Sequence, residues 1–251
     1  MQYENNLISI ITPVYNAKKY IDKTIASVQQ QSYTNWEMIL IDDCSTDGSD
    51  AIIKELASSD ERLRYYRNEA NLGAAQSRNK ALLLAKGRYV AFLDSDDLWD
   101  AKKLSIQIEY MKEHNVPFCF TACRVIDADG QPTGKERHVP SSVDFDTLLK
   151  GNVIPCLTVV LDRVAFSKIE MPSIGHEDYA LWLSLLKECH HADGIDEVLA
   201  SYRIAQGSLS GNKLKAATWT FHIYRNYLGL GLCKSMYLMV HYVVRALKKR
   251  M

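Results

Sequence analysis

The chain has 251 residues, with 30 acidic and 30 basic side chains, so no net charge favours nucleic acid as a partner. Hydrophobic residues make up 47% and charged residues 24% of the sequence, which is typical of a globular protein and excludes a disordered one. The best candidate for a membrane span is interrupted by Lys234, His241 and Arg245 and falls short of about 20 apolar residues. We therefore expect a folded domain that is not an integral membrane protein.

The cysteine pattern gives an expectation about the compartment. The six cysteines include no Cys-x-x-Cys pair, and the N-terminus carries no leader of the secretory kind. We expect a cytoplasmic protein, with peripheral association on the inner face of the cell membrane as a further option.

Short β-branched runs alternate with segments of helical period through the first hundred residues, which predicts parallel strands joined by helices. We expect strands at 7–12, 36–42, 63–67 and 88–93, and helices at 17–31, 47–58 and 74–85. The second half has a looser pattern, with a helix at 101–114, strands flanking the turn at 127–130, a helix at 177–188, a strand at 198–203 and final helices at 214–228 and 232–248. The prediction is one α/β domain, with a mostly parallel central sheet flanked by helices and a C-terminal helical tail.

Acidic residues follow two of the predicted strands, at the sheet edge where ligands of such folds bind. One strand is followed by Asp94, Asp96 and Asp97, whose carboxylates repel one another unless a cation lies nearby. Mg²⁺ or Mn²⁺ suits such oxygen ligands, and the alternative is that Asp96 or Asp97 caps the next helix. Another strand ends in Asp42 and Asp43. These residues are either ordinary caps and turn formers before the next helix, or one carboxylate accepts the N3–H of a uracil.

Three further positions have both a functional and a structural interpretation. Tyr15 offers an aromatic face to a base, or simply packs. The glycine-containing stretch that starts at Asn71 opens a helix carrying Arg78, which meets either a diphosphate or the acidic strand ends in an ion pair. Glu177 and Asp178 start a later helix, either as caps or with one carboxylate as the general base that inverting glycosyl transfer requires.

Five ordered motifs resemble the family-two glycosyltransferases of the nucleotide-diphospho-sugar transferase fold, described as GT-A. They lie at residues 9–16, 41–47, 71–79, 87–97 and 177–178, and Tyr202-Arg203 with Ser208 and Ser210 is similar to a donor-side loop of that family. The resemblance implies one glycosyltransferase domain at 1–228, in which about 1–97 binds the nucleotide-sugar and about 98–228 binds the acceptor. The pattern of apolar and basic residues predicts that 229–251 is an amphipathic basic helix.

By the same resemblance, several residues receive expected functions. Nucleotide binding falls to Pro13, Tyr15, Asp43, Asn71, Arg78 and Asp94; metal binding falls to Asp96, with Mn²⁺ or Mg²⁺; Asp178 is the base; and Glu177, Trp182 and Arg203 are acceptor or loop residues. The sequence departs from the family pattern at Gln76 and Ala81, neither of which bears on this chemistry. The Gln-x-x-Arg-Trp motif of processive members is absent, which favours addition of a single sugar.

The resemblance implies a nucleotide-sugar donor, UDP-linked by expectation, and a saccharide acceptor carried on a polyprenyl diphosphate in bacterial surface polysaccharide synthesis. A catalytically silent nucleotide-sugar-binding scaffold is the non-enzymatic alternative, and a sugar-phosphate nucleotidyltransferase is a second enzymatic one. Apolar residues recur at Met236, Val240, Val243 and Leu247, before a basic end. This tail packs on its own domain or a partner copy, or contacts a membrane surface.

Overall fold

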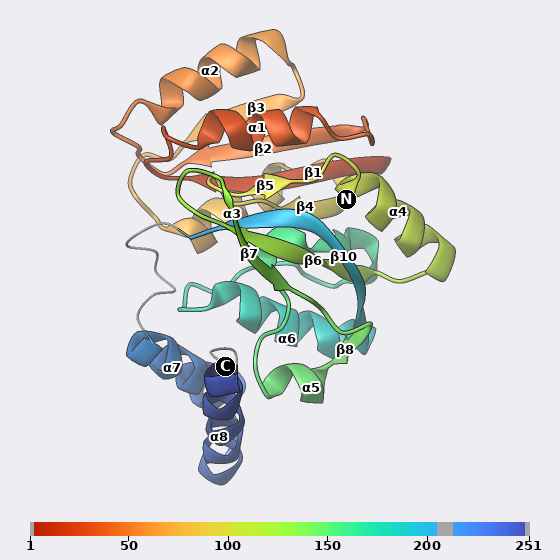
Figure 1. Ribbon diagram of the computed structural model, residues 1–251, viewed down its shortest axis with the longest axis vertical. Helices are drawn as coiled ribbons and strands as arrows, with labels where there is room; N and C mark the ends of the chain where they lie inside the picture. The colour runs from red at the N-terminus through yellow and green to blue at the C-terminus, as the bar shows by residue number, and fades with distance from the viewer. Residues whose placement is uncertain (1–2, 205–212, 249–251) are drawn as a thin grey trace.

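The computed structural model describes residues 3–204 and 213–248, and in this part of the chain a ten-stranded mixed sheet lies between layers of helices (Figure 1). The main order is β3-β2-β1-β4-β9-β6-β10-β5, with β7 beside β6 and β8 beside β10. The strands are β1 (Glu4–Val14), β2 (Trp36–Asp42), β3 (Leu63–Arg67), β4 (Gly87–Phe92), β5 (Leu98–Trp99), β6 (Phe118–Ile126), β7 (Pro132–Arg137), β8 (Ser142–Asp144), β9 (Val160–Asp162) and β10 (His191–Arg203). The first four parallel strands and the mostly parallel α/β domain confirm the predicted fold class.

Helices cover both faces of the sheet, because successive strand residues point to opposite faces. On β1, Ile8 and Ile10 join the core under α1, whereas Ile11 joins the core on the other face with α6. The helices are α1 (Ile21–Gln29), α2 (Ser49–Ser59), α3 (Ala74–Leu84), α4 (Lys103–His114), α5 (Phe145–Leu149), α6 (Glu177–Cys189), α7 (Lys213–His222) and α8 (Leu232–Lys248), with short helical turns η1 (Cys156–Thr158), η2 (Arg163–Ala165) and η4 (Ile223–Tyr227).

The strand directions decide where a ligand site forms. Strands β1, β2, β4, β6 and β10 run parallel to one another, so their carboxyl ends meet at one edge of the sheet. The Asp43 amide, just after β2, donates to the Val14 carbonyl at the end of β1 over 2.8 Å. The polar residues that follow these strands are thereby gathered at one edge.

The C-terminal helices lie at one end of the molecule, away from the sheet (Figure 1). The predicted helix at 214–228 becomes α7 followed by a π-helical turn, η4, and α8 begins at Leu232 as predicted. No helix among the described residues is long and apolar enough to cross a bilayer. The six cysteines, all in described parts of the chain, form no disulfide.

Candidate active site

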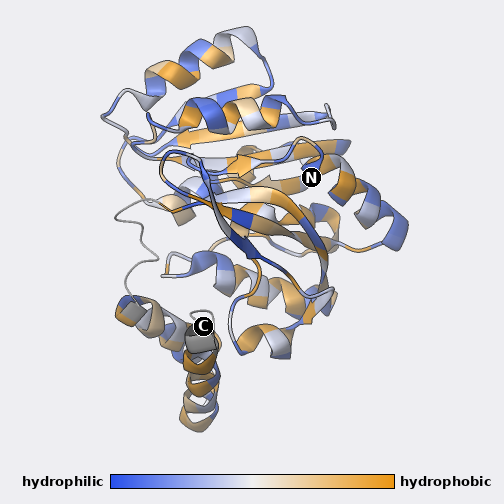
Figure 2. Ribbon diagram, in the orientation of Figure 1, coloured by the Kyte–Doolittle hydropathy of each residue, from blue (hydrophilic) through white to orange (hydrophobic). Residues whose placement is uncertain are grey.

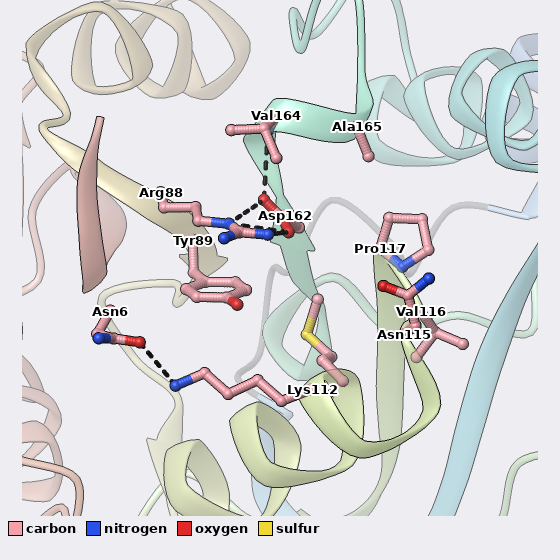
Figure 3. A pocket seen from close by; sticks show the side chains of 11 residues that line it. Asn6, Arg88, Tyr89, Lys112, Asn115, Val116, Pro117, Asp162, Val164 and Ala165 are labelled. Carbon is pink, nitrogen blue, oxygen red and sulfur yellow. Dashed lines mark hydrogen bonds and ion pairs between the residues drawn. The ribbon is translucent and has the colours of Figure 1, made fainter. Parts of the chain in front are cut away.

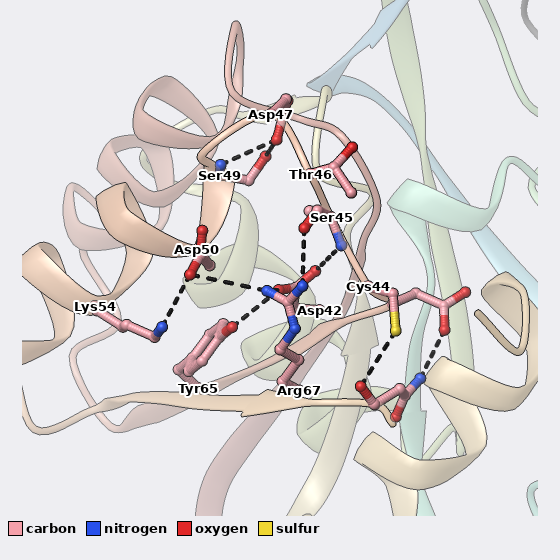
Figure 4. A network of polar contacts seen from close by, with 12 residues as sticks. Asp42, Cys44, Ser45, Thr46, Asp47, Ser49, Asp50, Lys54, Tyr65 and Arg67 are labelled. Carbon is pink, nitrogen blue, oxygen red and sulfur yellow. Dashed lines mark hydrogen bonds and ion pairs between the residues drawn. The ribbon is translucent and has the colours of Figure 1, made fainter. Parts of the chain in front are cut away.

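The Asp42 carboxylate organises the end of β2 and is fully buried. It accepts hydrogen bonds from the Ser45 amide, the Tyr65 hydroxyl and Arg67 Nη1, at 2.7, 2.9 and 2.8 Å (Figure 4). A carboxylate has about four lone-pair positions for hydrogen bonds, and these partners use three of those of Asp42. Asp42 therefore holds the loop after β2 in place and is not a ligand-binding group.

Asp43 is also buried, but it faces the neighbouring loop. Its Oδ1 accepts from Asn68 Nδ2 and the Leu72 amide, both at 2.8 Å, and its Oδ2 accepts from the Gly73 amide at 2.7 Å. Gly73 has a φ of +83°, a conformation that favours glycine. Among the described residues, the Gly73 amide is the single donor to Oδ2, so this oxygen keeps capacity for another hydrogen bond.

Pro13 and Tyr15 flank Val14, whose carbonyl accepts the hydrogen bond from the Asp43 amide, and Pro13 is half-buried. Tyr15 is 56% exposed at the end of β1, which disfavours the interpretation that this ring only packs. Asn71 is exposed, and its Nδ2 donates to the Asp43 carbonyl over 3.3 Å. Neither Asp42 nor Asp43 caps α2, whose N-cap position is Gly48, so the capping alternative was wrong.

Arg78 joins the two halves of the chain. Its side chain is 7% exposed, its Nη2 lies 2.5 Å from Asp94 Oδ1, and its Nη1 lies 2.7 Å from Glu177 Oε1. Asp94 lies just after β4 and Glu177 begins α6, so the two partners are far apart in the sequence. The ion-pair interpretation of Arg78 is therefore confirmed, and its buried Nε has no hydrogen-bond partner, which leaves one donor unused.

The carboxylates after β4 differ in their surroundings. Asp97 is buried and accepts from the Arg203 amide at 2.8 Å; burial, with Asp96 and Asp94 adding, raises its pKa well above the usual value. Asp96 is half-buried, and burial together with the charge of Asp94 raises its pKa to about 6. Helix α4 begins at Lys103 after an N-cap at Lys102, so neither Asp96 nor Asp97 caps it.

Arg203 fixes the turn that carries these carboxylates. Its Nε donates to the Asp96 carbonyl over 2.6 Å, and its Nη1 donates to the Asp127 carbonyl over 3.0 Å. The side chain is 3% exposed. Arg203 is thus a structural support of the Asp96–Asp97 turn, while Ser208 and Ser210 of the same motif lie outside the described residues.

Asp178 lies in the first turn of α6, after His176 at the N-cap position. It is half-buried beside Glu177, and burial first and Glu177 second raise its pKa to about 6, although Arg78 opposes the shift. No side chain caps α6, so the capping interpretation of Glu177 and Asp178 was wrong. A carboxylate with this pKa is ionised at neutral pH and is still a useful base.

Comparisons with known proteins decide the family. Residues 9–163 match the model "Glycosyl transferase family 2". The chain belongs to glycosyl transferase family 2. TuaG of Bacillus subtilis, named for teichuronic acid biosynthesis, is 47% identical over 98% of both chains. WfgD of Escherichia coli, named a UDP-Glc:alpha-D-GlcNAc-diphosphoundecaprenol beta-1,3-glucosyltransferase, is 39% identical over 98% of this chain and 96% of its own.

The solved structure of S. aureus TarS 1–349 in complex with UDP-GlcNAc has a similar fold, with a TM-score of 0.72 and 19% identity over 97% of this chain and 72% of that one. The GT-A-like fold expected of a family 2 enzyme is thereby confirmed, and the chain is a glycosyltransferase by family.

Two corrections concern side chains of this glycosyltransferase outside the motifs. Trp182 is fully buried and packs against Phe92 and Phe118, with ring centroids 5.6 and 5.3 Å apart, so it is a core residue and not an acceptor contact. Cys156 was missed: burial raises the pKa of its thiol well above the usual value, and Arg78, Asp94, Asp178 and Glu177 all act on it electrostatically. Nothing in the sequence pattern around Cys156 signals this position.

Among the described residues, no group of three or more His, Cys, Asp or Glu side chains has the arrangement of a protein-only metal site.

A hollow of about 480 Å³ lies at the other edge of the sheet, near Asn6 of β1 and Arg88 of β4 (Figure 3). Three hydrogen bonds of 2.6 to 3.0 Å join Arg88 to Asp162 there. This hollow is remote from the carboxylates of the candidate active site.

Proposed function

We propose that this family 2 glycosyltransferase is an inverting enzyme that moves one hexosyl or N-acetylhexosaminyl group from a UDP-sugar to a hydroxyl of a lipid-linked saccharide. The observation that carries the proposal is the bridge through Arg78, which brings Asp94 of the nucleotide half beside Glu177 and Asp178 of the acceptor half. In a direct displacement the nucleotide-sugar and the acceptor hydroxyl must meet beside a general base. The bridge brings a carboxylate of the nucleotide-sugar side close to the candidate base Asp178.

The donor assignment rests on the groups that would hold a uridine. Tyr15 offers an open ring for stacking, and Asp43 Oδ2 has room for the N3–H donor of uracil beside the Gly73 amide. Pro13, near the end of β1, and Asn71, which donates to the Asp43 carbonyl, are the other two residues assigned to the uridine. The printed name of WfgD includes a UDP-glucose donor, and the TarS structure contains UDP-GlcNAc, which supports the same nucleotide here.

The reaction step is proposed for Asp178. Its carboxylate takes the proton of the acceptor hydroxyl as that oxygen attacks the anomeric carbon, while the bond from this carbon to the nucleotide diphosphate breaks on the opposite face. The pKa of about 6 keeps Asp178 ionised at neutral pH, and general-base assistance of this kind contributes about 10²–10⁴ in rate. Arg78 holds Glu177 and thereby reduces the negative charge next to this base.

The donor set around Asp96 fits a divalent cation. Asp96 and Asp94 are half-buried carboxylates close enough for the charge of one to raise the pKa of the other, and a cation relieves that repulsion. Mg²⁺ and Mn²⁺ sites of this kind use one or two protein carboxylates, with phosphate oxygens as further ligands, so no cluster of three side chains is needed. When bound, the ion would offset the charge that develops on the departing diphosphate.

The acceptor assignment rests on WfgD, whose name specifies GlcNAc linked through a diphosphate to undecaprenol. An acceptor with a polyprenyl chain lies in a membrane, so the enzyme would work at the cytoplasmic surface of that membrane, in surface polysaccharide synthesis. The name of TuaG supports the same class of pathway.

The test is release of nucleotide diphosphate from a panel of UDP- and GDP-sugars by the purified protein, with Mn²⁺, Mg²⁺ or a chelator. We expect slow release from one UDP-sugar that stops with the chelator and is lost in Asp96→Ala. Glu55→Ala, a matched change of an exposed carboxylate on α2, should behave like the wild type. Absence of both nucleotide binding and release with every metal would contradict the proposal, and nucleotide binding without release would favour a catalytically silent scaffold.

A further inference from the structure

The exposed side of α8 carries an unbroken apolar stripe. The exposed residues Leu232, Met236, Val240 and Val243 follow one another at spacings of four, four and three, which places them on one face of a helix. Tyr237 and Val244 widen this face and are 57% and 43% exposed. Figure 2 shows the hydrophobic colouring of the helix, which lies at the end of the molecule.

The opposite side of α8 is anchored, so the exposed stripe has a fixed direction. Leu238 is 3% exposed and belongs to the core cluster that includes α6, and Ser235, three residues earlier on α8, is fully buried. The helix therefore does not need its outer face for packing on its own domain. Single exposed apolar residues are ordinary, but six on one helix face indicate an interaction surface.

The charge around this stripe indicates its partner. From residue 204 to the end, the sequence has eight Lys or Arg residues and no Asp or Glu, although the whole chain is neutral. The exposed Lys215 and Lys234 belong to this basic segment. An apolar stripe within a purely basic segment matches an anionic lipid surface, whereas a second copy of the same surface would be repelled.

The α7 helix links this surface to the acceptor side of the site. The Trp219 ring packs so closely on Gly175 that a Cβ there would lie 2.0 Å from it, and the ring also meets His176 edge-on at a centroid distance of 5.3 Å. Asp178 follows two residues later. A bilayer on the α7–α8 surface would therefore lie on the side of the molecule from which a lipid-linked acceptor approaches the base.

We propose that the outer face of α8, with the basic segment around it, docks on an anionic phospholipid bilayer. The role of this docking, delivery of a lipid-linked acceptor, rests on the proposed function, whereas the docking itself is inferred from the exposed apolar face and the basic charge. The docking surface is defined by its six exposed apolar residues, Leu232, Met236, Tyr237, Val240, Val243 and Val244. Apolar insertion and attraction between the basic side chains and lipid phosphates act together.

The test is co-sedimentation of the full chain with vesicles of phosphatidylcholine, or of equal parts phosphatidylcholine and phosphatidylglycerol. We expect binding to the anionic vesicles alone, weakened by salt, and weakened about tenfold or more in the double variant Met236→Glu, Val240→Glu. Leu83→Glu is the matched control, because Leu83 is a 79% exposed leucine on α3, and this variant should bind like the wild type.

Two results would overturn the docking proposal: equal binding of the double variant and the wild type, or a dimer in solution that the double variant dissociates. Light scattering of both proteins reads out the second result. UDP release from the donor, measured without vesicles, should be the same in the double variant and the wild type. If the wild type does not bind anionic vesicles but releases UDP, docking alone is contradicted; if it binds vesicles but releases no UDP, the proposed reaction alone is contradicted.

Discussion

Replacement of Arg78 by methionine should move the pH dependence of the reaction. The positive charge of Arg78 lowers the pKa of Asp178, which burial and Glu177 raise to about 6. A nearby opposite charge typically lowers a carboxyl pKa by about 1–3, so for removal of Arg78 we work the prediction with a rise of about 2, to about 8. The sign is upward, because a cation favours the ionised form of Asp178.

The magnitude follows from the fraction of ionised base. At pH 7 a group with a pKa of about 6 is about nine-tenths ionised, and one with a pKa of about 8 is about one-tenth ionised. Turnover by Arg78→Met should thus fall about tenfold at pH 7 and largely recover at pH 9. Loss of the buried pair should also cost about 3 kcal/mol of unfolding free energy, at the low end of the usual range because Asp94 and Glu177 are 34% and 23% exposed.

The assay is kcat for nucleotide diphosphate formation between pH 5 and pH 9.5, with unfolding in urea measured on the same samples. Arg88→Met is the matched control, because it breaks an ion pair with Asp162 at the opposite edge of the sheet. It should lower stability without moving the acid limb of the profile. An unchanged or downward-shifted limb in Arg78→Met, or an equal shift in Arg88→Met, would refute the reasoning.

Three further predictions concern binding, stability and the acceptor side. Tyr15→Ala should weaken UDP binding, measured by calorimetry, by about 1–3 kcal/mol with little change in Tm, since the ring is 56% exposed; equal affinity would contradict base stacking. Lys103 is fully buried beside Gln107, and burial lowers its pKa to about 7. The unfolded chain therefore binds one more proton than the folded chain between about pH 7 and pH 10, so the unfolding free energy of the wild type should rise with pH in this range. Lys103→Met should lack this rise. Parallel slopes of the two proteins would contradict a neutral Lys103. Gly175→Ala should lower kcat for transfer more than donor affinity, because its Cβ would displace the Trp219 ring beside the base, and full transfer activity would exclude this coupling.

The sequence predicted those parts of the fold that local pattern determines. The strands at 36–42 and 63–67 match β2 and β3 residue for residue, because their runs of β-branched and aromatic residues end at clear turn signals. Strands β5, β8 and β9 were missed because each has only two or three residues and exists through pairing with distant strands. Their register is a property of the assembled sheet.

The site shows the same division. The positions of Asp43, Asp96 and Asp178 at strand and helix ends follow from chain order, whereas the partners of Arg78 could not be deduced, because Glu177 lies 99 residues away in the sequence. Trp182 was misassigned because α6 is buried on almost every side, so helical spacing does not identify a ligand-facing side. Cys156 enters the site from a short turn without any motif of its own.

The most direct test of the central claim is transfer from the UDP-sugar selected by the panel to a lipid-diphosphate-linked GlcNAc, compared between the wild type and Asp178→Asn. The account predicts a product with inverted anomeric configuration by proton NMR, and a turnover about 10²–10⁴ lower in the variant at unchanged UDP affinity. Turnover of Asp178→Asn within a few-fold of the wild type, or a product with retained configuration, would contradict it.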